Sequence, residues 1–389
     1  MKSKYAVVVI GYNRLYSLER LCVSLNGANY LGDNVDLIIS LDFCENNALY
    51  MFSESFQWNF GEKRVIFHEK KMGLKKHILS CGIFLEEYEA LAILEDDIFV
   101  SPEFYSYMIQ AIKFYEKDDN IAGISLYSFE RNFYNGLGFK PAQSSYDTFF
   151  MQMAQSWGQI WLKRQWKEFY DWYLENRERN IFTDLHVPMA IKKWGDSSWL
   201  KYHTAYCVLK NKFFVYPYNA LTTCFMETGV HAKYSDTTGQ VPLYSGQKRN
   251  YNFASFDEQA VKYDVFYERM EMEKYIFGLA ENKPVCMDLY GDKYQYDGYT
   301  YLLTTKEFKH SSRLGSYALQ LKPQELNVIF EVEGEDIYLY NIEDIIERIA
   351  VKKNKWKRIE YFSAPKVTSD FQMMLMYFRK LWRRHLSKK

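Results

Sequence analysis

Four short apolar runs, separated by turns and by stretches with helical spacing, shape the first quarter of the chain. The first run is continuous rather than alternating, which is typical of a strand buried on both faces of a parallel sheet. The runs occupy residues 5–10, 35–41, 64–68 and 90–94. Residues 18–25 and 75–88 lie between them and are predicted to be helices. The order strand, helix, strand, strand, helix, strand predicts a doubly wound α/β domain with a mostly parallel sheet.

The character of the chain changes along its length, and 389 residues exceed the usual size of one domain. Residues 150–275 are rich in Trp and Tyr, and short tyrosine-rich pieces with strand-like composition follow them. We expect these pieces to form a small β or α+β appendage. The predicted divisions are a main domain at 1–275 with halves at 1–125 and 126–275, an appendage at 276–368, and a terminal helix at 369–389.

The overall composition excludes several classes of protein. Hydrophobic residues make up 48% of the chain and aromatic residues 18%, which excludes a disordered or collagen-like chain. Forty-nine basic and 49 acidic side chains leave no net charge to attract nucleic acid, so no nucleic-acid partner is expected. The six cysteines form no CxxC pair, which favours free thiols over disulfides or a zinc site.

The N-terminal residues MKSKYAVVVI contain an apolar stretch that is too short for a secretion signal and has no small-residue cleavage site. No window of the chain reaches the roughly 18 apolar residues that a membrane-spanning helix needs. We therefore expect a cytoplasmic protein that does not cross a bilayer.

The strongest candidate for chemistry is the acidic triplet Glu95-Asp96-Asp97, which follows the strand predicted at 90–94. Adjacent carboxylates repel one another, and placing them at the end of a buried strand is costly unless a cation or hydrogen-bond donors neutralise them. Hard oxygen ligands of this kind suit Mg²⁺ or Mn²⁺, whose coordination is commonly completed by water and substrate phosphates. The alternative is an acidic first turn of a helix that begins near Pro102 and Glu103, where the helix dipole favours negative charge.

Two further polar residues follow predicted strands. Arg14 lies in the turn after the first strand, where a guanidinium can reach a diphosphate; the alternative is a surface arginine. Asp42 follows the second strand, where a carboxylate can accept a hydrogen bond from a nucleobase or a ribose; the alternative is an aspartate that caps a loop. Neither the glycine fingerprint of dinucleotide-binding folds nor the P-loop motif is present.

Together these segments resemble the inverting glycosyltransferases of the GT-A fold, specifically those similar to N-acetylglucosaminyltransferase I and bacterial family 2 enzymes of surface polysaccharide synthesis. The resemblance covers residues 4–235. It is carried by Tyr12-Asn13-Arg14, by Ser40-Leu41-Asp42 and by LEDDIFVSPEFYSYM at 94–108. It implies a Rossmann-like fold with a nucleotide half followed by an acceptor half, and a nucleotide diphosphate sugar, first of all a UDP-sugar, as the donor.

The resemblance also implies roles for individual residues. Asp97 would be the direct ligand of Mn²⁺ or Mg²⁺, and Glu95 and Asp96 would contact ribose or sugar. Asp42 would contact uracil, and Arg14 would lie beside the diphosphate.

Two later segments extend the resemblance. Trp157, within QSWGQIWLKRQW at 155–166, would form part of the floor under the donor sugar and the acceptor; the alternative is a Trp-rich amphipathic helix packed on the core. His231, in Thr228-Gly229-Val230-His231, would contact the diphosphate or the metal in an element that closes the site; the alternative is a structural histidine.

A catalytic base is required because direct displacement at the anomeric carbon needs a group that takes the proton of the attacking hydroxyl. The segment WGDSSW at 194–199 resembles the one that carries this base, which makes Asp196 the candidate and places Trp194 beside the acceptor. Because Gly and Ser surround a single Asp here, Asp184 and Asp171 are the alternatives.

Residues 370–389 carry six basic residues and one acidic residue, with Phe371, Leu375, Phe378 and Trp382 on one helical face. A basic amphipathic helix of this kind is typical of an anchor on anionic lipid. It predicts peripheral attachment to the inner face of the cell membrane and suits a glycan or lipid-linked saccharide acceptor. The alternative is a helix packed on the acidic stretch 331–347.

Three other functions are weaker. A sugar nucleotidyltransferase normally has a glycine- and basic-rich loop after the first strand, and GYNRLYS at 11–17 does not supply one. A glycoside hydrolase takes its paired acids from separated strands rather than from one contiguous triplet. A catalytically inactive glycan-binding or scaffold protein on the same fold would not need the acidic triplet.

Overall fold

The structure is a computed structural model, and it describes residues 3–227, 237–248, 250–257, 259–276, 278–279, 283–345, 350–351 and 355–362, together with Met374 and Phe378. The described residues form two compact units. The first unit contains the chain up to Ser128, then Gln143–Glu227, and then the described residues between 237 and Val265. The second contains Phe129–Ala142 and the chain from Phe266 onward. The compact division thus falls near residue 266 and assigns a segment of the predicted acceptor half to the second unit.

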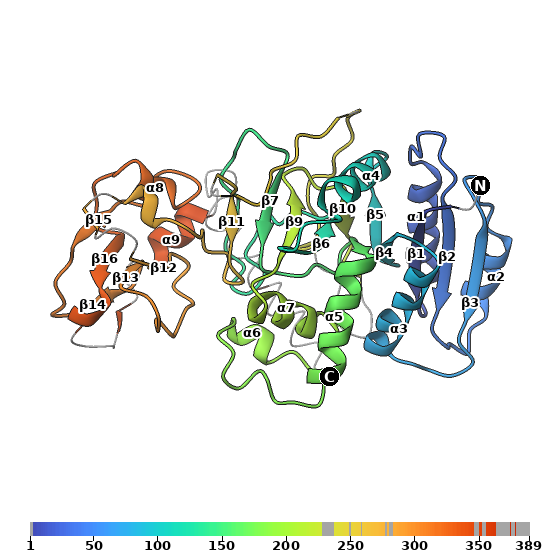
Figure 1. The fold of residues 1–389 in the computed structure, drawn as a ribbon, viewed down its shortest axis with the longest axis horizontal. Coiled ribbons are helices and arrows are strands. Elements are labelled where there is room, and N and C mark those ends of the chain that lie inside the picture. Colours follow the sequence, from blue (N-terminus) through green and yellow to red (C-terminus); the bar gives the residue numbers. More distant parts are fainter. Residues whose placement is uncertain are drawn as a thin grey trace. The chain divides into compact units, whose positions relative to one another are not determined.

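The four apolar runs form parallel neighbours in one sheet, in the order β4-β1-β2-β3 (Figure 1). Their bounds are β1 Tyr5–Gly11, β2 Asp36–Leu41, β3 Lys63–Phe67 and β4 Ala90–Glu95. The first predicted helix is α1 (Leu15–Asn26), and the second is α3 (Leu74–Ser80) continued by a 3₁₀ turn, Cys81–Glu86. The helix α2 (Ala48–Ser55) was not predicted.

The other half of the sheet is mixed rather than parallel, and its order from the edge is β11-β7-β9-β6-β8 before β4. The strand β8 runs antiparallel to both β4 and β6, and β7 runs antiparallel to β9. The prediction of a mostly parallel sheet therefore holds fully in the nucleotide half, whereas in the other half the parallel pairs are β6 with β9 and β7 with β11. The bounds are β6 Ile121–Ser125, β7 Thr148–Met151, β8 Gln159–Leu162, β9 Phe213–Pro217 and β11 Lys262–Tyr263.

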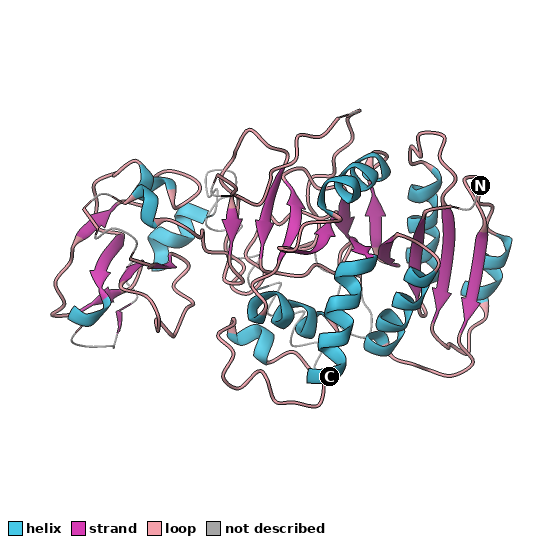
Figure 2. Ribbon diagram, viewed as in Figure 1, coloured by secondary structure: helices cyan, strands magenta, loops and turns pink. Residues whose placement is uncertain are grey.

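The Trp-rich segment is half strand and half helix. After β8 the chain enters α5 (Lys163–Asn176), and Trp166 of α5 stacks on Trp161 of β8 with ring centroids 3.6 Å apart. The remaining elements of this unit are α4 Phe104–Tyr115, α6 Met189–Lys192, α7 Leu200–Leu209, and the antiparallel pair β5 Ile98–Val100 and β10 Thr222–Cys224 (Figure 2).

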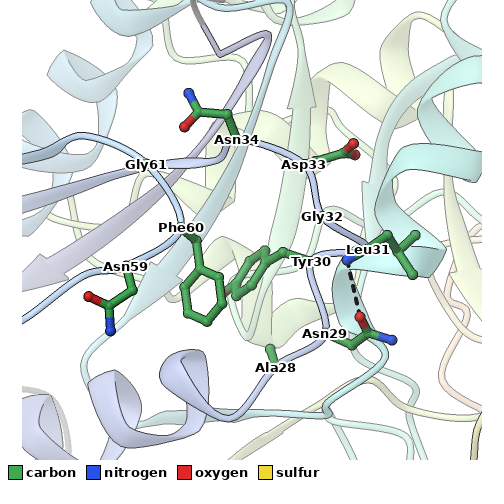
Figure 3. A pocket seen from close by; sticks show the side chains of 10 residues that line it. All are labelled: Ala28, Asn29, Tyr30, Leu31, Gly32, Asp33, Asn34, Asn59, Phe60 and Gly61. Atoms are coloured by element: carbon green, nitrogen blue, oxygen red, sulfur yellow. Dashed lines mark hydrogen bonds between the residues drawn. The ribbon is translucent and has the colours of Figure 1, made fainter.

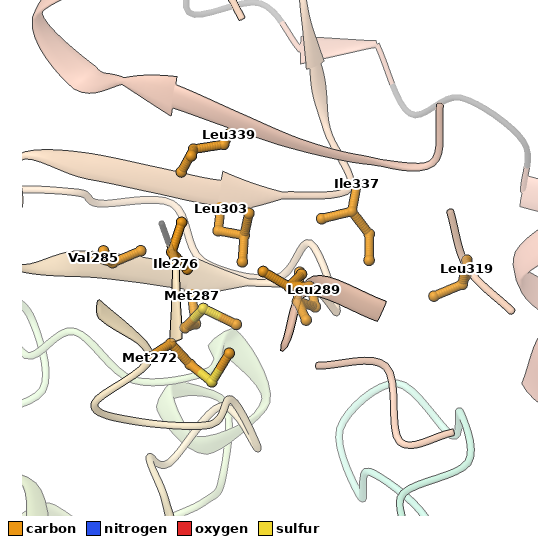
Figure 4. Packing of buried hydrophobic residues seen from close by; sticks show 10 residues of the cluster. Met272, Ile276, Val285, Met287, Leu289, Leu303, Leu319, Ile337 and Leu339 are labelled. Carbon is orange, nitrogen blue, oxygen red and sulfur yellow. The ribbon is translucent and has the colours of Figure 1, made fainter. Parts of the chain in front are cut away.

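The second unit contains a four-stranded sheet in the order β12-β13-β16-β15 and a short pair, β14 with β17. Its core is a cluster of aliphatic and methionine side chains that includes Met272, Met287, Leu303 and Leu339 (Figure 4). The bounds are β12 Val285–Asp288, β13 Tyr301–Thr304, β14 Glu307–Phe308, β15 Gly315–Tyr317, α8 Leu326–Ile329, β16 Ile337–Asn341, β17 Ala350–Val351 and α9 Lys355–Phe362, with 3₁₀ turns at Glu273–Tyr275 and Ile342–Asp344.

Two predictions about the chain as a whole can be compared with the structure. All six cysteines are free, and five of them are buried, which confirms the expectation of free thiols. Among the helices of the described residues, none is both long enough and apolar enough to span a membrane.

His203 of α7 lies in an aromatic cage inside the first unit. Its ring stacks on Phe169 at 3.9 Å and lies 5.0 Å from the ring of Phe214, and the residue is fully buried. Neither ring nitrogen has a hydrogen-bond partner among the described residues. Burial without a counter-charge lowers the pKa of His203 to about 3.

This histidine predicts loss of stability in acid. Below pH 6.5 the unfolded chain protonates His203 and the folded chain does not, so the free energy of unfolding falls as pH decreases from 6.5 towards 3. Between pH 7.5 and pH 5, we expect the thermal midpoint of His203→Phe to fall by less than that of the unmodified protein. An exposed histidine, changed in His310→Asn, is the control. Equal losses in His203→Phe and the unmodified protein would contradict the prediction.

Candidate functional site

The carboxyl ends of β1, β2 and β4 meet at one edge of the sheet. Ile10 of β1 is paired with Ser40 of β2 on one side and with Glu95 of β4 on the other. The chain leaves these strands through Arg14, Asp42 and Asp96. The structure therefore brings the predicted residues of the nucleotide half to a single edge, where ligands bind in folds of this kind.

Arg14 contacts two members of the acidic triplet. It is the residue that precedes α1. The Arg14 guanidinium donates through Nε and Nη2 to the two carboxylate oxygens of Asp96 and through Nη1 to Asp97 Oδ2 at 3.1 Å. Arg14 is thus the cation that the triplet requires, rather than a surface arginine.

One guanidinium does not balance the triplet. Burial, together with the charges of Asp97 and Asp96, raises the pKa of Glu95 to about 8. Burial also raises the pKa of Asp96 to about 6, although Arg14 opposes this shift. Burial lowers the pKa of Arg14, but the charges of Asp96 and Asp97 raise it by more, so the net pKa lies above the usual value. The edge therefore has an excess of negative charge that favours a further cation.

The triplet is not the first turn of a helix, which was the alternative. The strand β5 separates it from α4, which begins at Phe104. The partner of β5 is β10, and the Phe225 amide just after β10 donates to the Asp97 carbonyl at 2.9 Å. The pairing of β5 and β10 thus holds the backbone at Asp97 in place.

A second ion pair, which the sequence analysis missed, lies beside the triplet. Glu227 accepts hydrogen bonds from Arg20 Nη1 at 2.7 Å and Nη2 at 3.0 Å, and from Ser17 Oγ. The Arg20 guanidinium also lies 3.6 Å from the centre of the Phe225 ring. Arg14, just before α1, and Ser17 and Arg20 within it are spaced three residues apart, which was the one available signal. Glu227 gives none because it lies far away in the sequence.

Asp42 holds two loops together. Its Oδ1 accepts from the amides of Phe43 at 2.8 Å and Met72 at 2.7 Å, and its Oδ2 accepts from the amide of Gly73 at 2.9 Å. Burial raises the pKa of Asp42, but the backbone donors outweigh it, so the net pKa lies below the usual value. These contacts are those of an aspartate that caps a loop, which was the alternative interpretation of Asp42. A nucleobase contact stays a prediction, for which Oδ2 retains a second lone pair.

Trp157 is anchored to the same strand pair as Asp97. Thr222 Oγ1 of β10 donates to the Trp157 carbonyl at 2.6 Å, and Thr222 is paired with Val100 of β5. Gly158 follows with φ +97°, and a Cβ there would lie 2.7 Å from Thr222 Cγ2, so this position requires glycine. The partly exposed Trp157 ring lies edge-on to Tyr127 with centroids 4.8 Å apart.

The base candidates lie in different surroundings. Asp196 is exposed in the loop between α6 and α7; burial lowers the pKa of the neighbouring Lys201, an effect that the charge of Asp196 partly offsets. Lys201 Nζ also donates to the Trp194 carbonyl at 2.9 Å, which ties this loop to α7. Asp171 pairs with Lys167 at 2.5 Å on the exposed surface of α5, whereas Asp184 is exposed before α6.

Two predicted elements lie outside the described residues. They are His231 with its segment 228–231, and the basic tail at 370–389 apart from Met374 and Phe378.

A metal ion at this edge would rely on few protein ligands. Within the described ranges, no group of three or more His, Cys, Asp or Glu side chains is arranged to hold a metal ion. Mg²⁺ and Mn²⁺ at diphosphates commonly need only one or two carboxylates. Asp96 and Asp97 supply hard oxygen ligands in that number, so the donor set fits such a cation, although Arg14 contacts both carboxylates.

A cavity of about 630 Å³ lies at the opposite edge of the sheet (Figure 3). It is lined by residues 28–34, which precede β2, and by residues 59–61, which precede β3. The rings of Tyr30 and Phe60 lie side by side in it, with centroids 4.4 Å apart. None of the predicted site residues lines this cavity.

No family model and no curated protein matches this chain. Solved structures resemble part of it. TarS 1–349 of S. aureus has a TM-score of 0.35 at 16% identity, over 56% of this chain and 59% of that chain. Its complex with UDP-GlcNAc has a TM-score of 0.37 at 15% identity, over 59% and 60%. The mannosyltransferase PcManGT from Pyrobaculum calidifontis, in complex with GDP-Man and Mn²⁺, has a TM-score of 0.36 at 14% identity, over 60% of each chain.

The chain thus spans about three fifths of the length of each of these structures. At these values of identity and TM-score, function has to be inferred from the residues of this chain.

Proposed function

We propose that this protein is a metal-dependent glycosyltransferase that moves a sugar, with inversion, from a nucleotide diphosphate donor to a glycan or a lipid-linked saccharide. The observation that carries the proposal is the acidic triplet at the carboxyl edge of β4, contacted by Arg14 from the end of β1. A UDP-sugar carrying a hexose or an N-acetylhexosamine is the first donor to test. Similarity to N-acetylglucosaminyltransferase I and a role in polysaccharide biosynthesis are part of the same proposal.

Each group at the donor side has one task. Asp97 would hold Mn²⁺ or Mg²⁺ directly, and such a cation neutralises the charge that develops on a leaving diphosphate. Arg14 and His231 would bind the diphosphate oxygens. Glu95 and Asp96 would accept hydrogen bonds from sugar or ribose hydroxyls, and Asp42 would accept one from the nucleobase.

The acceptor side needs a base and a platform. Asp196 would take the proton of the attacking hydroxyl on a carboxylate oxygen, which raises the nucleophilicity of that hydroxyl. Trp157 and Trp194 would form apolar surfaces under the sugar rings. We also propose that residues 370–389 bind an anionic membrane surface on its cytoplasmic side, which would bring the enzyme to a lipid-linked acceptor.

Donor binding can be tested without knowing the acceptor. In a thermal-shift panel of nucleotide diphosphates and nucleotide sugars, we expect UDP or one UDP-sugar to raise the thermal midpoint only when Mn²⁺ is present. A ligand at 100 times its Kd stabilises the folded protein by about 2.7 kcal/mol, which is readily detected. A folded protein that responds to no nucleotide diphosphate would contradict the proposal and favour a glycan-binding protein instead.

A further inference from the structure

Arg14 fills the space between two carboxylates of the triplet. Its guanidinium contacts both oxygens of Asp96 and one oxygen of Asp97. The side chains are largely buried, with exposed fractions of 22% for Arg14, 6% for Asp96 and 16% for Asp97. The shared position between these two carboxylates is therefore already taken by a positive charge that belongs to the protein.

A divalent cation between these carboxylates would compete with the guanidinium. Mg²⁺ binds oxygens at about 2.0–2.1 Å, and a cation held by both carboxylates would compete for the Asp96 oxygens and for Asp97 Oδ2, which accept from Arg14. Two cations a few ångströms apart also repel each other strongly in a partly buried site. Occupation by Arg14 and occupation by a divalent cation are thus linked, and each weakens the other.

Among the described residues, the neighbouring cation Arg20 is not free to take over from Arg14. The neighbouring Arg20 is committed to Glu227, which accepts from both of its terminal nitrogens and from Ser17. Removing the Arg14 side chain would therefore leave Asp96 and Asp97 as uncompensated, largely buried carboxylates, a costly arrangement that an external cation relieves.

We propose that Arg14 is an internal counter-cation that keeps free divalent cations off Asp96 and Asp97, and that a cation enters only together with a diphosphate that accepts the released guanidinium. The first half of this proposal concerns the protein alone. The second half rests on the function proposed above. The consequence is an enzyme that binds metal and donor together rather than metal first.

Mn²⁺ alone is the first probe. Titration of the full-length protein with Mn²⁺, followed by the electron paramagnetic resonance signal of the free ion, should show at least tenfold tighter binding to Arg14→Gln than to the unmodified protein. Adding Asp97→Asn to Arg14→Gln should abolish the gain. The control is Arg64→Gln, which changes the net charge equally but removes an arginine of β3 that is paired with Glu87. Equal Mn²⁺ affinity of Arg14→Gln and the unmodified protein would overturn the proposal.

UDP tests the second half. UDP should tighten Mn²⁺ binding more in the unmodified protein than in Arg14→Gln, because only the former has to release a guanidinium. An equal effect of UDP on both proteins would overturn this half. If UDP binds neither protein, the proposed function fails, while the titration with Mn²⁺ alone still decides whether Arg14 excludes the cation.

Arg14→Lys covers the case in which Arg14→Gln does not fold. An ammonium group is a point charge that cannot bridge both carboxylates as the planar guanidinium does. We expect Arg14→Lys to bind Mn²⁺ with an affinity between those of the unmodified protein and the neutral variant. An affinity no higher than that of the unmodified protein would count against the proposal.

Discussion

Asp97→Asn is expected to lower the rate of sugar transfer by at least about 10²-fold while the protein stays folded. The proposed cation contributes several kcal/mol to stabilising the leaving diphosphate, and every 1.4 kcal/mol corresponds to a factor of ten in rate. The amide is nearly isosteric with the carboxylate, and its neutrality relieves repulsion from Glu95 and Asp96. The measurement is UDP release from a UDP-sugar in the presence of Mn²⁺, with the thermal midpoint recorded alongside.

Asp119→Asn is the matched control for this variant. Asp119 is 84% exposed and pairs with Arg164 on the surface, so its replacement changes the charge equally without touching the triplet. We expect the control to keep the transfer rate of the unmodified protein. Full activity of Asp97→Asn would remove Asp97 from the metal site.

Asp196→Asn is expected to keep donor binding but to lose roughly 10²- to 10⁴-fold in transfer, which is the range that general bases contribute. The exposed carboxylate of Asp196 makes few contacts that stabilise the fold, so the effect should be confined to catalysis. Donor binding is followed by the UDP-dependent thermal shift with Mn²⁺, and transfer by the release of UDP with an acceptor present.

The alternatives to Asp196 are tested side by side. Asp184→Asn and Asp171→Asn should transfer sugar at the rate of the unmodified protein, and Asp171 is already paired with Lys167. If one of these variants loses transfer and Asp196→Asn does not, the role of base belongs to that residue instead.

The nucleotide half could be predicted from the sequence because its signals are local. Strands β1 and β4 are continuous apolar runs, and β2 and β3 each contain three consecutive apolar residues; such runs indicate strands without knowledge of their neighbours. The predicted helices matched α1, and α3 together with the 3₁₀ turn that continues it, within a few residues. Helix α2 was missed because Ala48–Ser55 has only eight residues, too few for the local pattern to distinguish it from a loop, and its N-cap residue Asn47 makes no side-chain cap hydrogen bond.

The second half of the sheet could not be predicted in the same way. The strands β7 and β8 have four residues each, and their directions depend on which strands they join rather than on their own composition. The reversal of β8 between β4 and β6 is a long-range pairing that no local pattern encodes.

For the candidate site, the residue types and their places at strand ends were readable from the chain. Parallel strands bring their carboxyl ends to one edge, so Arg14, Asp42 and the triplet had to lie near one another once the strands were identified. The contacts themselves are tertiary. That Arg14 bridges Asp96 and Asp97, that Asp42 caps two loops, and that Arg20 is held by Glu227 all depend on groups from segments up to 207 residues apart. Hydrophobic periodicity acts over a few residues and is written in the sequence, whereas the partner of a charge is decided by which chain segments the packed sheet brings together.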